Sequence, residues 1–267
     1  RALATLERLR AAWDVGSASL QFTGSVPLHS GLGAGTQLIL AVMHALAAIY
    51  DVALSQADVM RLSGRGGASG IGLHAFLHGG FIVDGGHKFP ERKQSYLPSA
   101  ASADAGVGPL LLRHDFPDWD ILLVIPQGRH ISGEEEVRLF QGLCPMPSDA
   151  AQVICHELVM GMLPALVEGD VGGFARSLER SQAVGWKDVE IDAQGEVVRK
   201  TIEFARECGA HGAAMSSWGP ATAVFADDAA ALKVEMDGFL ESLPRGGVSL
   251  VTRANNDGAR VTVDDTA

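Results

Sequence analysis

The sequence predicts an α+β fold made of two halves, each with two layers of secondary structure. Helical and strand-like stretches follow one another without the strict β–α alternation of a doubly wound parallel sheet. The 267 residues suffice for one large domain or two modest ones, and a hydrophobic content of 47% is ample for a core. A boundary is predicted at 115–118, just before a buried strand, which divides the chain into domains 1–117 and 118–267.

The composition bounds the kinds of partner that the chain is expected to have. A formal net charge of −11 argues against a nucleic-acid surface. The longest apolar run, 38–50, is too short for a membrane span, and the chain opens on a basic amphipathic segment instead of a signal peptide. The three cysteines form no CxxC motif, so neither a zinc site nor a disulfide framework is indicated. We therefore expect a cytoplasmic protein with small-molecule partners, no nucleic acid and no membrane.

The first half is predicted to contain four helices and two strands. Leu6 and Leu9 belong to one apolar stripe at helical spacing. Ser55, with Asp58 three residues on, forms a capping box that begins a short helix. The predicted helices cover 2–13, 36–50 (buried), 55–62 and 71–78, the strands cover 17–26 and 80–84, and 91–109 is an exposed loop.

The second half is predicted to be richer in helices. Asp149 and Asp170 are interpreted as N-caps of two long helices. Met160, Met162 and Leu163 are expected in the core. A short helix is expected to start at Glu134–Glu136. The later predicted helices cover 149–167, 170–184, 196–208 and 228–242, and the predicted strands cover 119–126, the run ending at Phe225, 248–252 and 259–263.

A glycine-rich segment precedes the helix predicted at 36–50. Gly31, Gly33 and Gly35 fall within five positions, where a backbone without Cβ atoms can approach a ligand closely. The free N–H groups and the dipole of the helix that follows favour an anion, usually phosphate. The alternative is a plain turn with a helix cap.

A second glycine-rich segment, 64–87, interleaves glycines with ionisable side chains. Such a density of glycine costs chain entropy and suggests a backbone held near a ligand. The alternative is a pair of glycine-rich turns around a buried hairpin. The interleaved residues are Arg65, His74, His78, Asp84 and His87, with Lys88 next.

The pattern Pro27-x-x-x-Gly31-Leu-Gly-x-Gly35 resembles the phosphate loop of the GHMP small-molecule kinase superfamily. The variant Gly31-Leu-Gly-Ala-Gly-Thr-Gln-Leu38 resembles one branch, the beta-ribofuranosylaminobenzene 5'-phosphate synthases. Segments 69–87 and 215–220, with a weaker match at 252–259, extend the resemblance over nearly the whole chain. It implies a ribosomal S5 domain 2-like N-terminal part with a left-handed crossover, a ferredoxin-like C-terminal part, and an active site between them.

Three departures from the kinase pattern favour the synthase branch. Ala34 and Gly35 replace the two serines of the kinases' Gly-Leu-Gly-Ser-Ser-Ala loop, one of which commonly helps to hold Mg²⁺. Gly72 stands where many kinases carry the catalytic Asp of a Ser-Gly-x-Asp motif. Met215–Pro220 replaces a C-terminal glycine motif. The alternatives are an ATP-dependent GHMP kinase and a GHMP-like protein that binds a metabolite without turnover.

The resemblance implies a reaction between phosphoribosyl diphosphate and 4-aminobenzoate or a close para-substituted benzoate such as 4-hydroxybenzoate. Ribose C1 joins the ring, and CO₂ and diphosphate leave, in an early step of tetrahydromethanopterin biosynthesis. Departure of diphosphate requires N–H donors, cations and normally Mg²⁺. The expected residues are, as catalytic groups, Arg65, Asp84 and His87; for phosphate, His29, Gly31, Gly33, Ala34, Gly35, Thr36 and Gln37; for substrate, Ser69, His74, Lys88, Ser216, Ser217 and Trp218; and for the metal, Asp84.

Several of these assignments have structural alternatives. Trp218 is either a flat wall for the ring or a core aromatic at a strand start. Asp84 either binds Mg²⁺ or caps the Gly85-Gly86 turn. His29, His74 and His87 lie beside glycine-rich segments and are candidates for ligand contact, with a purely structural role as the alternative. His44 and His156 are expected to be satisfied core residues. One residue of Glu134–Glu136 faces the cleft, or all three are a solvated helix start.

The resemblance also concerns what precedes the first residue. Superfamily members usually begin with several strands upstream of the position of Arg1, so the fold is expected to lack its first N-terminal strands in this chain. Those strands would pair with 17–26. Their absence would leave an open sheet edge, which favours dimerisation, and the family implies a homodimer.

Overall fold

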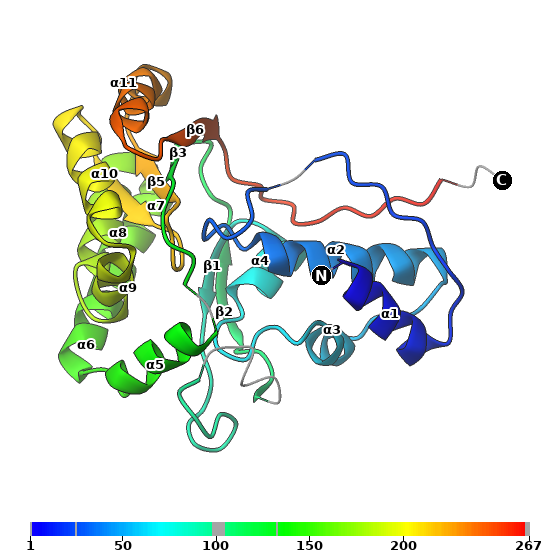
Figure 1. The fold of residues 1–267 in the computed structure, drawn as a ribbon. Helices are drawn as coiled ribbons and strands as arrows, with labels where there is room; N and C mark the ends of the chain where they lie inside the picture. The colour runs from blue at the N-terminus through cyan, green and yellow to red at the C-terminus, as the bar shows by residue number, and fades with distance from the viewer. Residues whose placement is uncertain (1, 25, 98–104, 132, 265–267) are drawn as a thin grey trace. The chain divides into compact units, whose positions relative to one another are not determined.

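A computed structural model describes residues 2–24, 26–97, 105–131 and 133–264. By their internal contacts the residues fall into two compact units. The first unit comprises 1–26, 33–115 and 255–267, and the second comprises 27–32 and 116–254. Each unit thus includes a short segment that lies far away in the sequence from the rest of it (Figure 1).

The first unit packs four helices around one apolar core. Its helices are α1 (Ala2–Trp13), α2 (Ala34–Ile49), α3 (Gln56–Ser63) and α4 (Ile71–His78). Leu9 of α1, Leu40 and Met43 of α2, and Val59 of α3 are buried together in this core. The capping box is confirmed, because Ser55 accepts a hydrogen bond from the Asp58 amide. All four helices were predicted from the sequence.

A two-stranded antiparallel sheet completes the first unit. Strand β1 (Phe81–Asp84) pairs with β2 (Leu110–His114), which sequence analysis did not find. The segment 255–259 packs against the end of α4, where Ala259 donates to Phe76 O over 2.7 Å and Asn255 O accepts from Gly80. These bonds explain why the predicted strand at 259–263 is wrong: the segment bonds to a helix end and forms no ladder.

The strand predicted at 17–26 is also wrong for the part that the structure describes. Residues 17–24 and Val26 have no ladder partner in either sheet. Alternation alone does not make a strand, since a ladder requires a neighbouring strand to accept and donate hydrogen bonds. Tyr50 instead fastens this segment through a 2.8 Å bond from its hydroxyl to Ser17 O.

The second unit is a four-stranded antiparallel sheet with helices packed on it (Figure 1). The strand order is β4 (Gly212–Met215), β5 (Thr222–Phe225), β3 (Ile121–Pro126) and β6 (Gly247–Thr252). In chain order this is 2-3-1-4, the arrangement of a ferredoxin-like sheet, as the resemblance implied. Leu122 and Val224 lie opposite each other and face the buried side chains of α10 (Glu196–Glu207) and α11 (Ala229–Ser242).

The remaining helices of the second unit precede α10 in the chain. They are α5 (Glu134–Leu143), α6 (Ser148–His156), a π-helical segment (Glu157–Met162), α7 (Leu163–Glu168), α8 (Val171–Gln182) and α9 (Trp186–Gln194). Asp170 caps α8 as predicted, through its bond to the Gly173 amide. The Asp149 prediction is wrong: α6 begins one residue earlier, so Asp149 lies within its first turn. Sequence analysis also missed α9 and β4.

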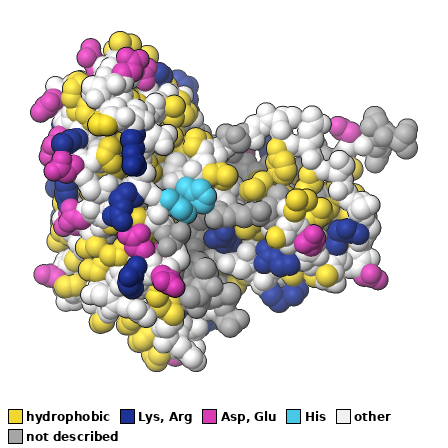
Figure 2. Space-filling model, viewed as in Figure 1, with side chains coloured by type: hydrophobic (Ala, Val, Ile, Leu, Met, Phe, Trp, Pro, Cys, Tyr) yellow, Lys and Arg dark blue, Asp and Glu magenta, His cyan; other side chains and the backbone are white. Residues whose placement is uncertain are grey.

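One helical run, Ser148–Glu168, is long and apolar enough to cross a membrane by length and composition, contrary to expectation. Only 22% of its most apolar window is buried, and Met160, expected in the core, is 66% exposed. His156, also expected in the core, is exposed because it lies on the solvent side of α6. Glu157 is nevertheless buried and bonds through both carboxylate oxygens to Arg180 of α8, each over 2.8 Å. On the face in Figure 2, basic and acidic side chains are interspersed over this unit.

Candidate active site

The glycine-rich loop is fastened to the turn between β4 and β5. Ser30 O accepts from the Ala221 amide over 2.9 Å, and Ser216 Oγ donates to Gly31 O over 3.0 Å. Gly31 has φ of +90°, and a Cβ there would lie 2.1 Å from Ser216 O. Only glycine fits at this close approach. The sequence predicted both segments as functional, and the structure joins them within the second unit.

The start of α2 has the geometry of an anion site. Gly33 is its N-cap, with φ of +70° and no capping side chain. Gly33 O accepts from the amides of Thr36 and Gln37 over 2.9 and 3.1 Å. Within the described residues, the amides of Ala34 and Gly35 have no backbone acceptor. These unpaired donors at the positive end of a 16-residue helix favour a bound anion.

The first turn of α4 lies beside the first turn of α2. Gln37 Nε2 donates to Gly72 O over 2.9 Å, and a Cβ on Gly72 would lie 3.1 Å from Thr36 Cγ2. Gly72, which the motif resemblance aligns with the kinases' catalytic carboxylate, therefore lies against the first turn of α2 and carries only hydrogen. No proton-abstracting group is available from this position.

Asp84 closes the other side of the α4 start. Its Oδ2 accepts from the Gly70 amide over 2.5 Å and from Ser69 Oγ over 3.5 Å, while Oδ1 accepts from the Gly86 amide over 3.1 Å. Oδ2 thus holds the end of β1 to the helix start, and Oδ1 caps the Gly85-Gly86 turn, which is the structural alternative expected for this residue. Among the residues that the structure describes, no three His, Cys, Asp or Glu side chains are arranged to hold a metal ion. The described side chains around Asp84 therefore do not form a set of ligands that would hold Mg²⁺ without a substrate.

Trp218 stands in an aromatic cluster with Phe140 of α5 and Trp186 of α9. Its ring centroid lies 6.4 Å from that of Phe140 and 6.1 Å from that of Trp186. The indole N–H donates to Glu136 over 3.2 Å. One of the three acidic residues at the start of α5 therefore contacts Trp218, the residue predicted to stack on the substrate ring. Lys187 Nζ fixes the adjacent Ser217 through a 2.7 Å bond to its carbonyl.

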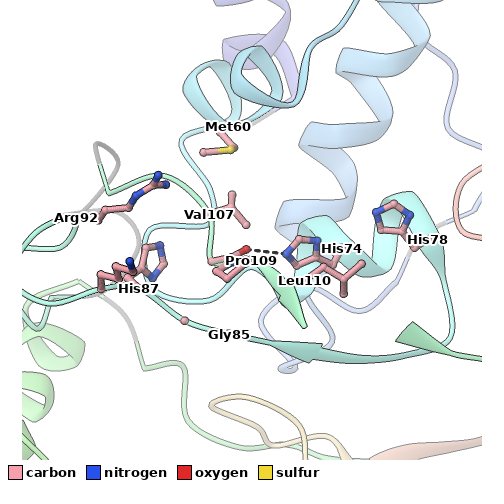
Figure 3. Close-up of a pocket in the computed structure, with 12 residues that line it drawn as sticks. Met60, His74, His78, Gly85, His87, Arg92, Val107, Pro109 and Leu110 are labelled. Atoms are coloured by element: carbon pink, nitrogen blue, oxygen red, sulfur yellow. Dashed lines mark hydrogen bonds between the residues drawn. The ribbon is translucent and has the colours of Figure 1, made fainter. Parts of the chain in front are cut away.

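Other predicted site residues lie elsewhere. His74, His87 and Lys88 line a cavity in the first unit, together with His78 and Arg92 (Figure 3). The ring centroid of His29, a residue at φ of +60°, lies 3.9 Å from that of His130. Arg65 is half-buried and its amide donates to Ser63 Oγ. His44 is not the satisfied core residue expected: its Nε2 is buried without a partner against Phe76, and burial lowers its pKa.

Comparison with known proteins gives the class of the chain. The GHMP kinases N terminal domain matches residues 1–80 and the GHMP kinases C terminal domain matches 162–238. Mevalonate kinase from L. major superposes with a TM-score of 0.66 at 16% identity, covering 97% of this chain and 77% of that one. Homoserine kinase from Cytophaga hutchinsonii gives 0.63 at 17% identity, with coverages of 96% and 76%. The fold is that of the GHMP kinase superfamily.

The relatives in sequence define the branch. A beta-ribofuranosylphenol 5'-phosphate synthase of Methanocaldococcus jannaschii is 38% identical over 91% of this chain and 73% of its own length. The enzyme of the same name from Archaeoglobus fulgidus is 38% identical over 92% of this chain and 77% of its own. The chain belongs to this family of synthases, and it is an enzyme of that reaction type.

Proposed function

We propose that the enzyme joins C1 of phosphoribosyl diphosphate to the ring of a para-substituted benzoate, releasing CO₂ and diphosphate. The observation that carries this proposal is Gly72, which leaves the anion site of α2 without the carboxylate that a phosphoryl-transferring relative would use. The relatives' names specify a ribofuranosylphenol, which favours 4-hydroxybenzoate over 4-aminobenzoate. The family resemblance assigns the product to tetrahydromethanopterin biosynthesis.

The proposed reaction needs no nucleophilic side chain. The C1–O bond breaks and its electron pair leaves with diphosphate, giving C1 oxocarbenium character. The ring carbon that bears the carboxylate attacks C1, since the para oxygen or nitrogen donates electron density to it. The bond to the carboxylate then breaks, its electron pair restores the aromatic ring, and CO₂ leaves. Atoms and charge balance without an oxidant or a general base.

The start of α2 supplies what the departing group requires. We assign the phosphates to the unpaired amides of Ala34 and Gly35, because N–H dipoles that are already oriented stabilise developing negative charge without reorganisation. Thr36 has its hydroxyl on the same first turn. Gly35 has no side chain, so the backbone can approach the ligand closely.

Trp218 is assigned to the aromatic ring of the benzoate. The indole is half-buried and held by Glu136, Phe140 and Trp186, which leaves it few alternative orientations. A flat aromatic face of this kind stacks well on a second ring. This assignment deepens the sequence prediction, which named Trp218 but not the three residues that hold it.

The Mg²⁺ requirement stays a prediction. Asp84 already accepts three hydrogen bonds, and no described cluster of ligands would hold the ion by itself. Mg²⁺ is commonly bound through one or two carboxylates together with substrate phosphates. If it acts here, we expect it to arrive with diphosphate oxygens, and chelation with EDTA during turnover tests that dependence.

A carbon-release assay tests the proposed function. The enzyme is incubated with phosphoribosyl diphosphate, Mg²⁺ and carboxyl-labelled 4-hydroxybenzoate or 4-aminobenzoate, with and without ATP. We expect labelled CO₂ in equal amount with or without ATP, and faster release from the hydroxybenzoate. Release that requires ATP, or ADP formation without CO₂, would support a kinase instead; ligand binding without any turnover would support a non-catalytic protein.

A further inference from the structure

A cavity of about 710 Å³ in the first unit gathers basic side chains from two stretches of the chain (Figure 3). Helix α4 contributes His74 and His78, and the segment after β1 contributes His87, Lys88 and Arg92. Among the residues that the structure describes, those that line it include no Asp or Glu. Its remaining walls are backbone and apolar side chains, including Met60, Val107, Pro109 and Leu110.

This cavity lies on a different face of α4 from the anion site at the start of α2. Gly72 and Phe76 face α2, where they meet Thr36 and His44. His74 and His78 each follow two residues later. At about 100° per residue, this step places them roughly 200° around the helix. The cavity and the α2 start are therefore two separate places in the same unit.

His74, one of the residues that line this cavity, has an unsatisfied polar atom. The residue is 2% exposed, and its Nε2 donates to Gly108 O over 3.0 Å. A carbonyl oxygen only accepts, so the proton is on Nε2, and the buried Nδ1 has no partner in the protein. A buried polar atom without a partner is costly, and a ligand would relieve that cost. His87 uses its Nε2 in the same way, donating to Gly106 O over 3.0 Å.

We propose that this cavity binds a small molecule through a phosphate group, at a site separate from the α2 start. Phosphate offers several oxygens to several donors, and guanidinium, ammonium and imidazolium groups are its usual partners. On binding, a phosphate group beside His74 supplies the hydrogen-bond partner that its Nδ1 lacks. The apolar walls accommodate the rest of the molecule, and the volume is typical of small-ligand sites. This inference does not depend on the proposed synthase chemistry.

The test is calorimetric titration with two probes, inorganic phosphate and ribose 5-phosphate. Wild type is compared with the double variant Lys88→Ala/Arg92→Ala, whose side chains are exposed, and with Arg10→Ala, an exposed cation of the same unit outside the cavity. We expect the double variant to lose at least about tenfold in affinity for one class of sites, since charge-assisted hydrogen bonds contribute on this scale. Arg10→Ala should bind as wild type does.

Ring nitrogen NMR of histidine locates the binding. The Nδ1 signal of His74, assigned by its loss in His74→Gln, should shift when either probe is added to wild type, and not in the double variant. Binding of ribose 5-phosphate alone would still support the site and would show that the walls contribute. Isotherms unchanged in the double variant, an unmoved His74 signal, or binding of neither probe would overturn the proposal, whatever the outcome of the CO₂ assay.

Discussion

Two glycines affect the chemistry of this chain because they have no side chain. Gly31 admits the close approach of Ser216 O, and Gly72 places no side chain beside Thr36, where the motif resemblance expects a kinase to carry a carboxylate. The sequence indicated both positions, because comparison with the kinase motifs shows where this chain has a glycine. It could not indicate that Glu136 would bond to Trp218, because that contact joins residues 82 positions apart and depends on tertiary packing.

At residue scale, we predict that Gly31→Ala destabilises the protein more than Gly33→Ala. Both residues have positive φ, so both substitutions introduce backbone strain of about 1 kcal/mol. A Cβ at Gly33 meets nothing within 4 Å, whereas at Gly31 it would meet a backbone oxygen at 2.1 Å. We expect a further loss of about 2 kcal/mol for Gly31→Ala, measured by urea unfolding. Equal losses would contradict the close packing of the loop on the β4–β5 turn.

The role proposed for Trp218 predicts a split between kinetic constants. Trp218→Ala should raise the KM for the benzoate about tenfold or more and change the KM for phosphoribosyl diphosphate little, because a stacked ring contributes on the order of 1 kcal/mol or more. Trp218→Phe keeps a flat face but loses the bond to Glu136, and it should recover most of the affinity. If both substrates were affected equally, Trp218 would be a core aromatic only.

At the scale of elements, the helices of the first unit were predictable, whereas β2, β4 and α9 were not. Strong apolar periodicity and the Ser55 cap define helices locally. Strands β2 and β4 have four or five residues each, and their pairing partners determine them. Helix α9 has Gly185 as its N-cap, with φ of +65°, and so has no capping side chain that the sequence could reveal.

Helix α9 has a buried carboxylate that predicts a pH dependence. Burial raises the pKa of Glu190 above its ordinary value of 4.5, although Lys187 acts in the opposite direction. From about pH 4.5 upward the unfolded chain ionises at this residue before the folded protein does, so stability falls as pH rises through the folded pKa. Glu190→Gln should remove this contribution and gain stability relative to wild type as pH increases.

The measurement is the urea midpoint of wild type and variant between acid and neutral pH, compared as a difference at each pH. Glu196→Gln is the control. Its pKa is lowered by the hydrogen bond from Lys200, so its contribution is present at higher pH and lost in acid, the opposite sign. A Glu190→Gln difference that stays flat or falls with pH would contradict the burial argument.

At the scale of the whole molecule, sequence analysis identified the superfamily, the branch and the ferredoxin-like sheet. It did so because short glycine motifs are local and have a direct chemical meaning. It predicted His74 and Lys88 to bind substrate from their nearness to glycines, and the structure places both at a cavity that lies on a different face of α4 from the start of α2. The oligomeric state stays a prediction that size-exclusion chromatography with light scattering tests.

The central claim is that a GHMP fold here performs transfer of a ribosyl group and no longer of a phosphoryl group. The most direct measurement is ³¹P NMR of one reaction mixture that contains phosphoribosyl diphosphate, 4-hydroxybenzoate, Mg²⁺ and ATP. We predict that free diphosphate and a new phosphate monoester appear together in equal amounts while the ATP signals stay constant. Growth of ADP signals with phosphoribosyl diphosphate unconsumed would contradict the claim.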